Sequence, residues 1–341
     1  MRKLGIFILG VLLSFAFAFC GHGFFAVSAS ATQPIIYIGG MSAGFTLKSG
    51  GIQVVGLSEV MTENGVISPA LQAGLRTNDR IIKADGAQTE TIAQLNAIVE
   101  KSNGKKLIVE IERTGENLSL DIIPVKDRTT NRYKIGILAR DSVSGIGTVT
   151  YVDQTNRRFG ALGHSVIGEN KKELCISDGV VYACSIIGIH KGIRGRAGEL
   201  RGMFLNDKPL GTAEKLCNCG IFGKLDEHFD TTDLTRTVAT SENACPGKAF
   251  IYSTIDGVET KRYAIEIVKV DKNHKENKNY VIKVTDEDLI AQTGGIVQGM
   301  SGSPIVQDDK LIGAVTHVFL NDPTRGYGID IQAMMKEQCL K

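Results

Sequence analysis

The sequence predicts a mainly β protein in which two folded domains follow an N-terminal apolar segment. Its 341 residues are 43% hydrophobic and 22% charged, a globular composition with enough chain for two separate cores. Glycine is abundant, with 39 residues, whereas proline is scarce and tryptophan is absent. Short runs rich in valine and isoleucine recur between glycine turns, a pattern typical of β-strands joined by tight turns.

The N-terminal 31 residues predict export. Arg2 and Lys3 precede an apolar run that begins at Leu4 and ends in the small residues of "SASAT". This order is typical of a signal peptide, but a run of ~20 apolar residues is also long enough to span a bilayer as an uncleaved anchor. Both alternatives place the remainder of the chain outside the membrane, so we expect an exported protein that is secreted or membrane-associated through this segment.

The charge and cysteine patterns exclude some partners. The formal net charge is only +2, without a long basic run, so we expect no nucleic acid. The cysteines do not form a C-x-x-C pair, so we expect no metal and no other cofactor. Cys217 and Cys219 flank one residue and would point to the same side of a strand. Disulfides, free thiols and simple packing all remain open for the cysteines after Cys20, which are Cys175, Cys184, Cys217, Cys219, Cys245 and Cys339.

The block from residue 35 to 126 alternates strands with two short helices. Ser68 and Pro69 are typical of a helix start, and "DRIIKADG" predicts a strand that ends in the Asp85-Gly86 turn. Residues 89–102 carry apolar side chains at helical spacing, and Thr114-Gly115 predicts a hairpin between two strands.

This block resembles a PDZ domain, through "SPALQAGLRTNDRIIKADG" (68–86), the helix at 89–102 and the strand "LIVEIER". The resemblance implies a loop whose backbone N–H groups receive a peptide carboxylate, next to a strand edge that accepts an added peptide strand. We expect this peptide-binding loop in the glycine-rich stretch that comprises Gly40, Met41, Ser42, Ala43, Gly44 and Phe45.

The second domain is expected to span residues 127–341, and its first residues belong to a charged segment at 126–134 that we interpret as a linker. Most of it consists of short strand patterns, and only "EDLIAQTG" and "IQAMMKEQC" look helical. Strands at such regular spacing predict a sandwich or barrels.

The stretch "GMSGSP" at 299–304 predicts a catalytic serine. A serine hydroxyl is a weak nucleophile that needs a base, an orienting acid and N–H donors for the oxyanion. Gly299 allows its own N–H and that of Ser301 to face one point, so these two groups form the expected oxyanion hole. The loop resembles the nucleophile loop of chymotrypsin-like proteases, with Ser301 as nucleophile, whereas Ser303 precedes Pro304 and is expected to begin a strand.

His164 is the best candidate for the base, because "GALGH" places it in a glycine-bounded turn after a strand. The acid is less clear from the residues alone. The order histidine, acid, serine leaves several candidates open, namely Asp178, Asp226, Asp230, Asp233, Asp256 and Asp286.

Several segments together resemble the stage IV sporulation protein B (SpoIVB) peptidase family, PDZ-bearing serine peptidases of endospore formers. They are "GALGH" (160–164), "GIHKGIRGRAGELRG" (188–202), "GIFGKLD" (220–226), "VTDEDLIAQTGGIVQGMSGSPIVQ" (284–307) and "LIGAVTHVFLNDPTRGYGI" (311–329). The resemblance implies a chymotrypsin-like double β-barrel, with His164 as general base, Asp286 as orienting acid and Ser301 as nucleophile. Asp286 is only fifteen residues before Ser301, so its role rests on the resemblance.

The same resemblance implies a function. It is that of a sporulation signalling protease in the space between the forespore and mother-cell membranes, which cleaves itself and a membrane-associated regulator of sigma-factor processing. The alternative is a PDZ adaptor with an inactive protease fold. A trimeric heat-shock protease fits less well, because in that class the PDZ domain follows the protease domain.

Two further expectations concern the surroundings of Ser301. Met300 stands where trypsin-like enzymes carry an acid that pairs with a new N-terminus, so we expect control through the PDZ block instead. The strand "AVTHVF" should form the substrate-binding wall, with Thr316, His317 and Val318 lining the site.

Overall fold

The computed structural model describes residues 35–166, 178–274 and 276–339. The predicted signal or anchor segment, residues 1–31, therefore lies outside the described residues, as do Cys20 and Cys175. Among the described residues, no helix is long and apolar enough to cross a membrane.

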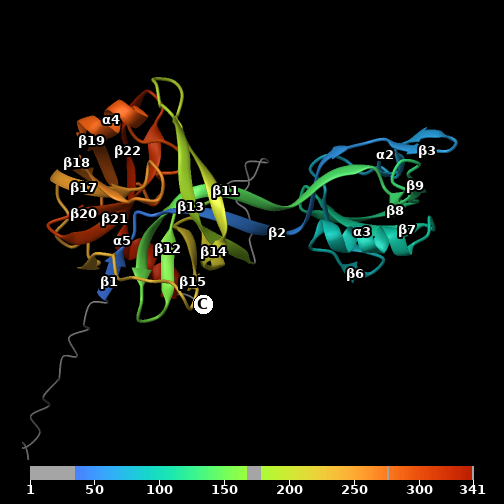
Figure 1. Cartoon of the computed structure of the whole chain (residues 1–341), viewed down its shortest axis with the longest axis horizontal. Helices are drawn as coiled ribbons and strands as arrows, with labels where there is room; N and C mark the ends of the chain where they lie inside the picture. Colours follow the sequence, from blue (N-terminus) through green and yellow to red (C-terminus); the bar gives the residue numbers. More distant parts are fainter. Residues whose placement is uncertain (1–34, 167–177, 275, 340–341) are drawn as a thin grey trace, which may run out of the picture. The chain divides into compact units, whose positions relative to one another are not determined.

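The predicted mainly β fold is confirmed, and two closed barrels form its larger part (Figure 1). In the first barrel the pairings run from β2 through β11, β12, β15, β14 and β13 back to β2. Its strands are β2 (Ser42–Leu57), β11 (Ile137–Asp153), β12 (Arg158–Ala161), β13 (Gly179–His190), β14 (Glu199–Cys217) and β15 (Gly220–Leu225). Outside the barrel, β1 (Ile35–Ile38) pairs with β11, and β16 (Arg236–Val238) pairs with β1.

The second barrel closes in the order β17-β18-β19-β22-β21-β20. Its strands are β17 (Gly247–Ser253), β18 (Lys261–Val270), β19 (Tyr280–Val284), β20 (Pro304–Gln307), β21 (Lys310–Phe319) and β22 (Asp322–Asp330). The two segments predicted as helical form α4 (Glu287–Thr293) and α5 (Ile331–Cys339). Alternate residues of β17 point inward, Ala249 and Ile251 among them, as the period of two in a half-buried strand requires.

The small domain has its own core between residues 52 and 135. Its elements are β3 (Val60–Thr62), β4 (Gly65–Ile67), α2 (Pro69–Gln72), β5 (Arg80–Ala84), β6 (Ala87–Gln88), α3 (Ile92–Lys101), β7 (Leu107–Arg113), β8 (Glu116–Ile122), β9 (Val125–Lys126) and β10 (Tyr133–Lys134). A capping box with Thr91 and Gln94 begins α3. Ser68 precedes α2 as predicted, but its hydroxyl donates to the Ser58 carbonyl (3.2 Å) instead of capping the helix.

The segment at 126–134 is part of the small domain and not the predicted linker. Its ends pair as the hairpin β9–β10, and Arg128 N donates to the Met61 carbonyl. The Lys134 ammonium beside Asp127 lowers the pKa of that carboxyl to about 2, with help from the Thr129 N–H. The charged residues of this segment therefore belong to a surface hairpin whose two strands are paired.

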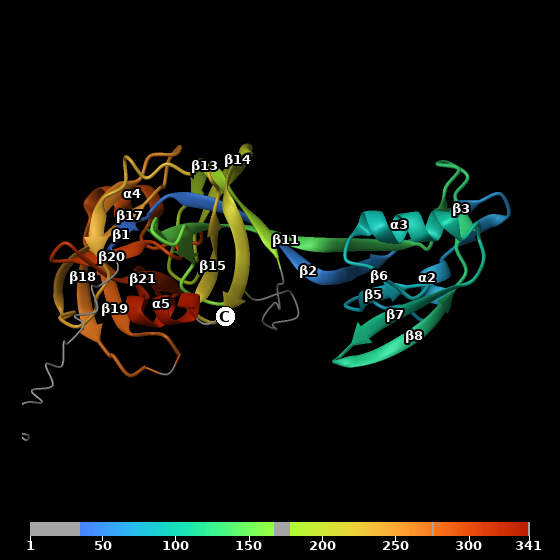
Figure 2. The same ribbon diagram turned by 90° about the horizontal axis from the view of Figure 1, so that it is seen from below.

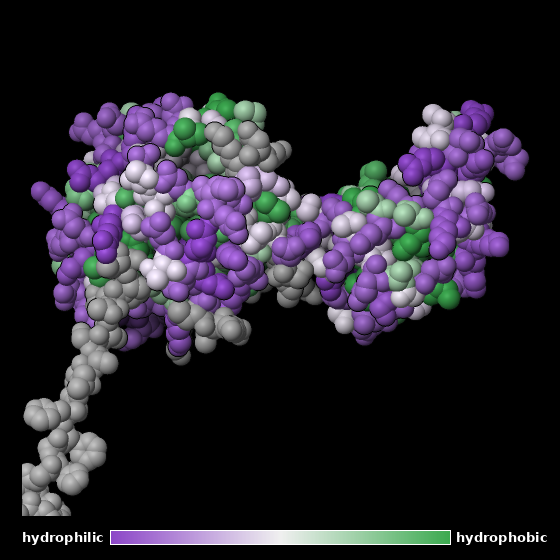
Figure 3. Space-filling model, turned by 60° about the horizontal axis from the view of Figure 1, so that its bottom comes forward, coloured by the Kyte–Doolittle hydropathy of each residue, from purple (hydrophilic) through white to green (hydrophobic). Residues whose placement is uncertain are grey.

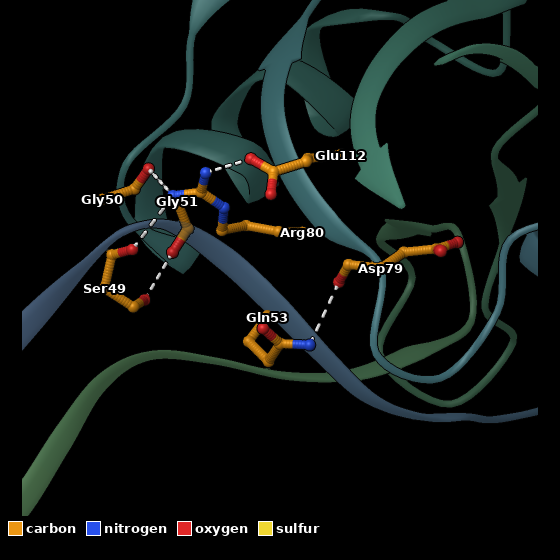
Figure 4. Close-up of polar contacts among 7 residues, drawn as sticks. All are labelled: Ser49, Gly50, Gly51, Gln53, Asp79, Arg80 and Glu112. Atoms are coloured by element: carbon orange, nitrogen blue, oxygen red, sulfur yellow. Dashed lines mark hydrogen bonds and ion pairs between the residues drawn. The ribbon is translucent and has the colours of Figure 1, made fainter. Parts of the chain in front are cut away.

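Polar contacts fix the point at which β2 enters the small domain (Figure 4). The Arg80 guanidinium donates to the carbonyls of Ser49 (3.4 Å) and Gly50 (3.3 Å) and also pairs with Glu112 on β7. The neighbouring Asp79 is only 1% exposed, and Arg113 donates to both of its carboxylate oxygens at 2.7 Å. This bidentate arrangement is the geometry in which a buried ion pair is best compensated.

β2 and β11 lie side by side along most of their length (Figures 1 and 2). The first part of β2 belongs to the first barrel, whereas Ile52 and Val54 belong to the core of the small domain. β11 likewise begins beside the small-domain core and ends in the first barrel. The face in Figure 3 is mostly hydrophilic, with hydrophobic residues in small separate groups, because the larger apolar side chains fill the cores.

Candidate active site

Residues from both barrels line one cavity of about 450 Å³. Its lining contains no Asp, Glu, Lys or Arg among the described residues. The lining residues are Phe45, Leu47, Val143, Ser144, Gly145, Ile146, Leu162, His164, Ser165, Val166, Ala197, Ile221, Ile296, Val297, Gln298, Gly299, Ser301, Thr316, His317, Val318 and Leu320. The cavity therefore brings together the predicted nucleophile, base, oxyanion-hole residues and substrate wall.

Ser301 is the serine that faces this cavity. Its hydroxyl donates to the Thr316 carbonyl on β21 at 2.8 Å. Ser303 is fully buried, and its hydroxyl has no partner among the described residues. Of the two serines in "GMSGSP", only Ser301 can meet a substrate in the cavity.

Thr148 of β11 hydrogen-bonds both to the loop that carries Ser301 and to the turn that carries His164. Its N–H donates to the Ser301 carbonyl (2.9 Å), and its hydroxyl donates to the Gly299 carbonyl (2.9 Å). Its own carbonyl accepts the N–H of Leu162 (3.2 Å), two residues before His164. Thr148 is only 1% exposed, so these bonds lie in a dry environment where a lost partner is costly.

The close approach of β11 to the nucleophile loop requires glycine at position 302. Gly302 has a φ of +96°, and a Cβ there would lie 2.1 Å from the Thr148 carbonyl oxygen. The Thr150 hydroxyl donates to the Gly302 carbonyl at 2.8 Å and so fixes the same contact.

The backbone N–H groups of Gly299 and Ser301 point to an oxyanion hole. Within the described part of the chain, neither group has an acceptor, whereas the N–H groups of Met300, Gly302 and Ser303 all bond to carbonyls. Gly299 adopts a φ of +99° that permits this orientation. Met300 is fully buried in the second barrel, away from any ion pair.

His164 follows β12 in a strained turn. Leu162 and Gly163 both have positive φ, at 67° and 71°, which is rare for leucine. The ring Nδ1 lies 2.7 Å from the Ser165 carbonyl oxygen. A carbonyl can only accept, so Nδ1 carries the proton and Nε2 is left with its lone pair, as a base requires. Burial lowers the pKa of His164, so the ring is neutral at physiological pH.

The predicted wall residues lie beside His164. The rings of His164 and His317 have centroids 4.8 Å apart. Burial in the cavity is the main cause that lowers the pKa of His317 to about 4, with smaller contributions from the nearby His164 and Lys278, so His317 too is neutral at physiological pH. Thr316 also lines the cavity, and its buried hydroxyl has no partner among the described residues, while Val318 adds an apolar contact.

Asp286 is the one member of the expected triad that does not line the cavity. It is the N-cap of α4, and its two carboxylate oxygens accept the N–H groups of Leu289 (3.0 Å) and Ala264 (3.1 Å). Neither this cavity nor the one beside it is lined by an aspartate. Among the described residues, no hydrogen bond joins Asp286 to His164, whose Nδ1 contacts the Ser165 carbonyl instead.

Residues 40–45 do not form the predicted PDZ loop. Ser42 to Phe45 are part of β2 in the first barrel, where β11 pairs with one edge and β13 with the other. A peptide strand therefore has no free edge to join there. Phe45 instead lines the cavity, and the space around Gly40 is filled by Tyr252 and Thr260 of the second barrel region.

Thr148 and Thr150 are not among the residues expected from the sequence, although "GTVTYV" alternates threonine with valine. Threonine is unusual at alternate positions of a strand that is buried on both faces, because each buried hydroxyl needs a partner. The pattern could therefore have indicated a hydrogen-bonding role. Within the described residues, no group of three or more His, Cys, Asp or Glu is arranged to hold a metal.

Comparisons with known proteins identify the chain as a serine peptidase that carries a PDZ domain. It belongs to the SpoIVB peptidase S55 family, whose model matches residues 131–335, more than half of the chain. A PDZ domain model matches residues 51–123. This match begins well after residue 35, where the sequence predicted the start of the PDZ domain.

Individual relatives share shorter parts. Regulator of sigma-E protease RseP of Escherichia coli is 44% identical over 71 residues, which is 21% of this chain and 16% of that protein. Its counterpart in Salmonella typhimurium is 38% identical over 68 residues, 20% of this chain and 15% of that protein. The chain spans about a quarter or less of the curated relatives it matches. The active form of the Rv3671c protease from M. tuberculosis has a TM-score of 0.37 and 16% identity, covering 58% of this chain and 76% of that one.

The capping role of Asp286 predicts a specific response to substitution. Asn can still accept the Leu289 N–H, so Asp286→Asn should keep kcat within about threefold, whereas Asp286→Ala should lose about 1 kcal/mol of unfolding free energy with the cap. Peptidase rates and urea denaturation measure these effects. A kcat loss of about 10⁴ in Asp286→Asn at unchanged stability would instead make Asp286 the orienting acid that the family resemblance implies.

Proposed function

We propose that the protein is an exported serine endopeptidase of sporulation signalling, with Ser301 as nucleophile and His164 as general base. The observation that carries the proposal is that Ser301 and His164 line one cavity, on two turns that hydrogen-bond to the same residue, Thr148. Membership of the SpoIVB peptidase family supports both the peptidase activity and the biological setting.

The geometry supports a two-step acyl transfer. The Ser301 hydroxyl turns from the Thr316 carbonyl toward Nε2 of His164, which takes its proton as Oγ attacks the scissile carbonyl. The N–H groups of Gly299 and Ser301 then stabilise the oxyanion in a cavity where water is scarce and hydrogen bonds are strong. His164 gives the proton to the leaving amine, and a water molecule completes the hydrolysis. The Ser165 carbonyl holds the histidine tautomer throughout.

The cavity favours substrates with a large apolar side chain at the cleaved position. Ile296, Val297 and Val318 come from the segments on either side of Ser301, and no charged residue of the described chain offers an ion pair there. An aspartate or lysine of the substrate would lose its hydration without compensation. Thr316 and the unpaired stretch of β21 around it can bind the substrate backbone.

We also propose peptide capture by the PDZ domain. From Ile137 to Ala139, β11 pairs with β2 on one side, and among the described residues no strand pairs with the other side of these three residues. There α3 lies close, and Ile92 N donates to Asp141 at 2.8 Å. A strand edge next to a helix is the setting in which PDZ domains add a peptide strand. Because the same strand reaches Thr148, a bound peptide can influence the active site.

The biological assignment rests on the family. We propose cleavage of the chain itself and of a membrane-associated regulator of an intramembrane protease, in the space between the two sporulation membranes. The local similarity to RseP, which is described as a regulator of sigma-E protease, supports a place in sigma-factor signalling. Attachment to the membrane would use residues 1–31, outside the described residues.

Substitution of the nucleophile tests the activity. Residues 32–341 should cut themselves over hours, whereas Ser301→Ala should yield no fragments, because a triad serine contributes most of the rate. Mass spectrometry identifies the fragments, and Ser303→Ala serves as the matched control that keeps its activity. Equal fragments from wild type and Ser301→Ala would mean another nucleophile. An intact wild type that also leaves unrelated peptides uncut would favour a PDZ adaptor.

The specificity can be measured with matched peptides. Substrates that differ only in the residue before the cut should show at least a hundredfold lower kcat/KM for Asp than for Leu, since an unpaired charge in an apolar cavity costs about 3 kcal/mol or more. Met, which is similar in volume to Leu, should lie within about tenfold of it. Preference for a charged residue would contradict the assignment of the cavity.

A further inference from the structure

Cys217 and Cys219 lie in one tight turn next to the active site. Cys217 ends β14, and Asn218 and Cys219 form the turn to Gly220 at the start of β15. We expected the two cysteines on one strand. Instead, Cys217 is the last residue of β14 and Cys219 lies in the hairpin turn that follows it. Both are free thiols in this structure.

The turn directs both sulfur atoms to the same side. Cys219 N donates to the Cys217 sulfur at 3.4 Å, and both side chains pack against the core under α5. Residues two apart have Cα atoms no more than about 7 Å from each other, close to the range that a disulfide spans. A bond between the two sulfurs needs only a local adjustment of the turn.

The two thiols differ in burial and in pKa. Pairs that form a disulfide by exchange show the same difference between the thiol that attacks first and the thiol that then resolves the mixed disulfide. Cys217 is half-buried, and a hydrogen bond from the Cys219 side chain lowers its pKa to about 7. The same contact and burial raise the pKa of Cys219, which is 5% exposed. The charges nearby are those of the Lys215–Glu337 ion pair (3.0 Å), of which Lys215 favours the Cys217 thiolate and Glu337 opposes it.

The turn also borders the catalytic histidine. Asn218 lines a second cavity of about 510 Å³ that His164 and His317 share. The Asn277 amide donates to both the Asn218 carbonyl and the Cys219 sulfur at 3.4 Å, which ties the cysteines to the wall of that cavity.

We propose that Cys217 and Cys219 are a thiol–disulfide exchange site, in the turn whose middle residue, Asn218, lines a cavity together with His164. The partner is an external disulfide such as oxidised glutathione. The Cys217 thiolate attacks one sulfur of that disulfide, its S–S bond breaks, and one glutathione leaves as a thiolate that takes a proton. Cys219 then loses its proton and attacks the Cys217 sulfur, which releases the second glutathione. Two protein thiols lose two electrons and two protons, and one external disulfide becomes two thiols.

The test uses the full chain with Ser301→Ala, which prevents self-cleavage and makes the result independent of the proposed peptidase activity. After treatment with oxidised glutathione, digestion and mass spectrometry should show that the peptide with Cys217 and Cys219 has lost two hydrogen atoms. Addition of Cys219→Ser should leave one glutathione attached to Cys217. Addition of Cys217→Ser should leave Cys219 unmodified, because its thiol is buried and protonated.

Exposed Cys245 is the internal control, since it should acquire glutathione in every variant. An unmodified Cys217 in a sample with modified Cys245 would overturn the proposal. A disulfide from Cys217 or Cys219 to any other cysteine would also overturn it. Both of these results are measured on the Ser301→Ala chain in which Cys217 and Cys219 are intact, so the outcome does not depend on how well the cysteine variants fold.

Discussion

The hydrogen bonds of Thr148 are the constraint on which the candidate site depends. A buried threonine uses its N–H, hydroxyl and carbonyl to bind Ser301, Gly299 and Leu162, and these contacts bring the nucleophile loop and the histidine turn together. They leave no room for a side chain at position 302. Because Thr148 lies on β11, which also pairs with β2 beside the small domain, a single strand runs from the PDZ domain to the cavity that Ser301 and His164 line.

Local patterns in the sequence were sufficient for much of the fold. Glycine turns between Val/Ile runs indicated the β architecture, and the Thr114-Gly115 turn and the helix that ends near Lys101 are confirmed. "GMSGSP" and "GALGH" led to Ser301 and His164, because nucleophile loops and histidine turns require glycine at fixed neighbouring positions. The structure places both residues in the same cavity.

Other features depend on contacts between distant segments, which local patterns do not reveal. "GGMSAGF" looks like an anion-binding loop, yet pairing with β11 and β13 makes it an interior barrel strand. Thr148 and Thr150 carry no catalytic signature, and their role appears only when their partners, 151 and 152 positions away, are in place. Asp286 has two competing descriptions: the orienting acid that the family resemblance implies, and the helix cap that the geometry shows. Only the second could have been read from "TDEDLIAQTG" by capping rules.

The most direct measurement is the rate at which a fluorophosphonate labels Ser301 in the Thr148→Val variant. Valine keeps the shape and the backbone bonds but removes the hydroxyl that holds the Gly299 carbonyl, a loss of about 1–3 kcal/mol for a buried acceptor. Labelling of Thr148→Val should be about tenfold slower, or more, than labelling of the wild type. Thr46→Val removes a hydroxyl from an exposed contact on β2 and should label at the wild-type rate. Equal labelling of all three folded proteins would contradict the central role of Thr148.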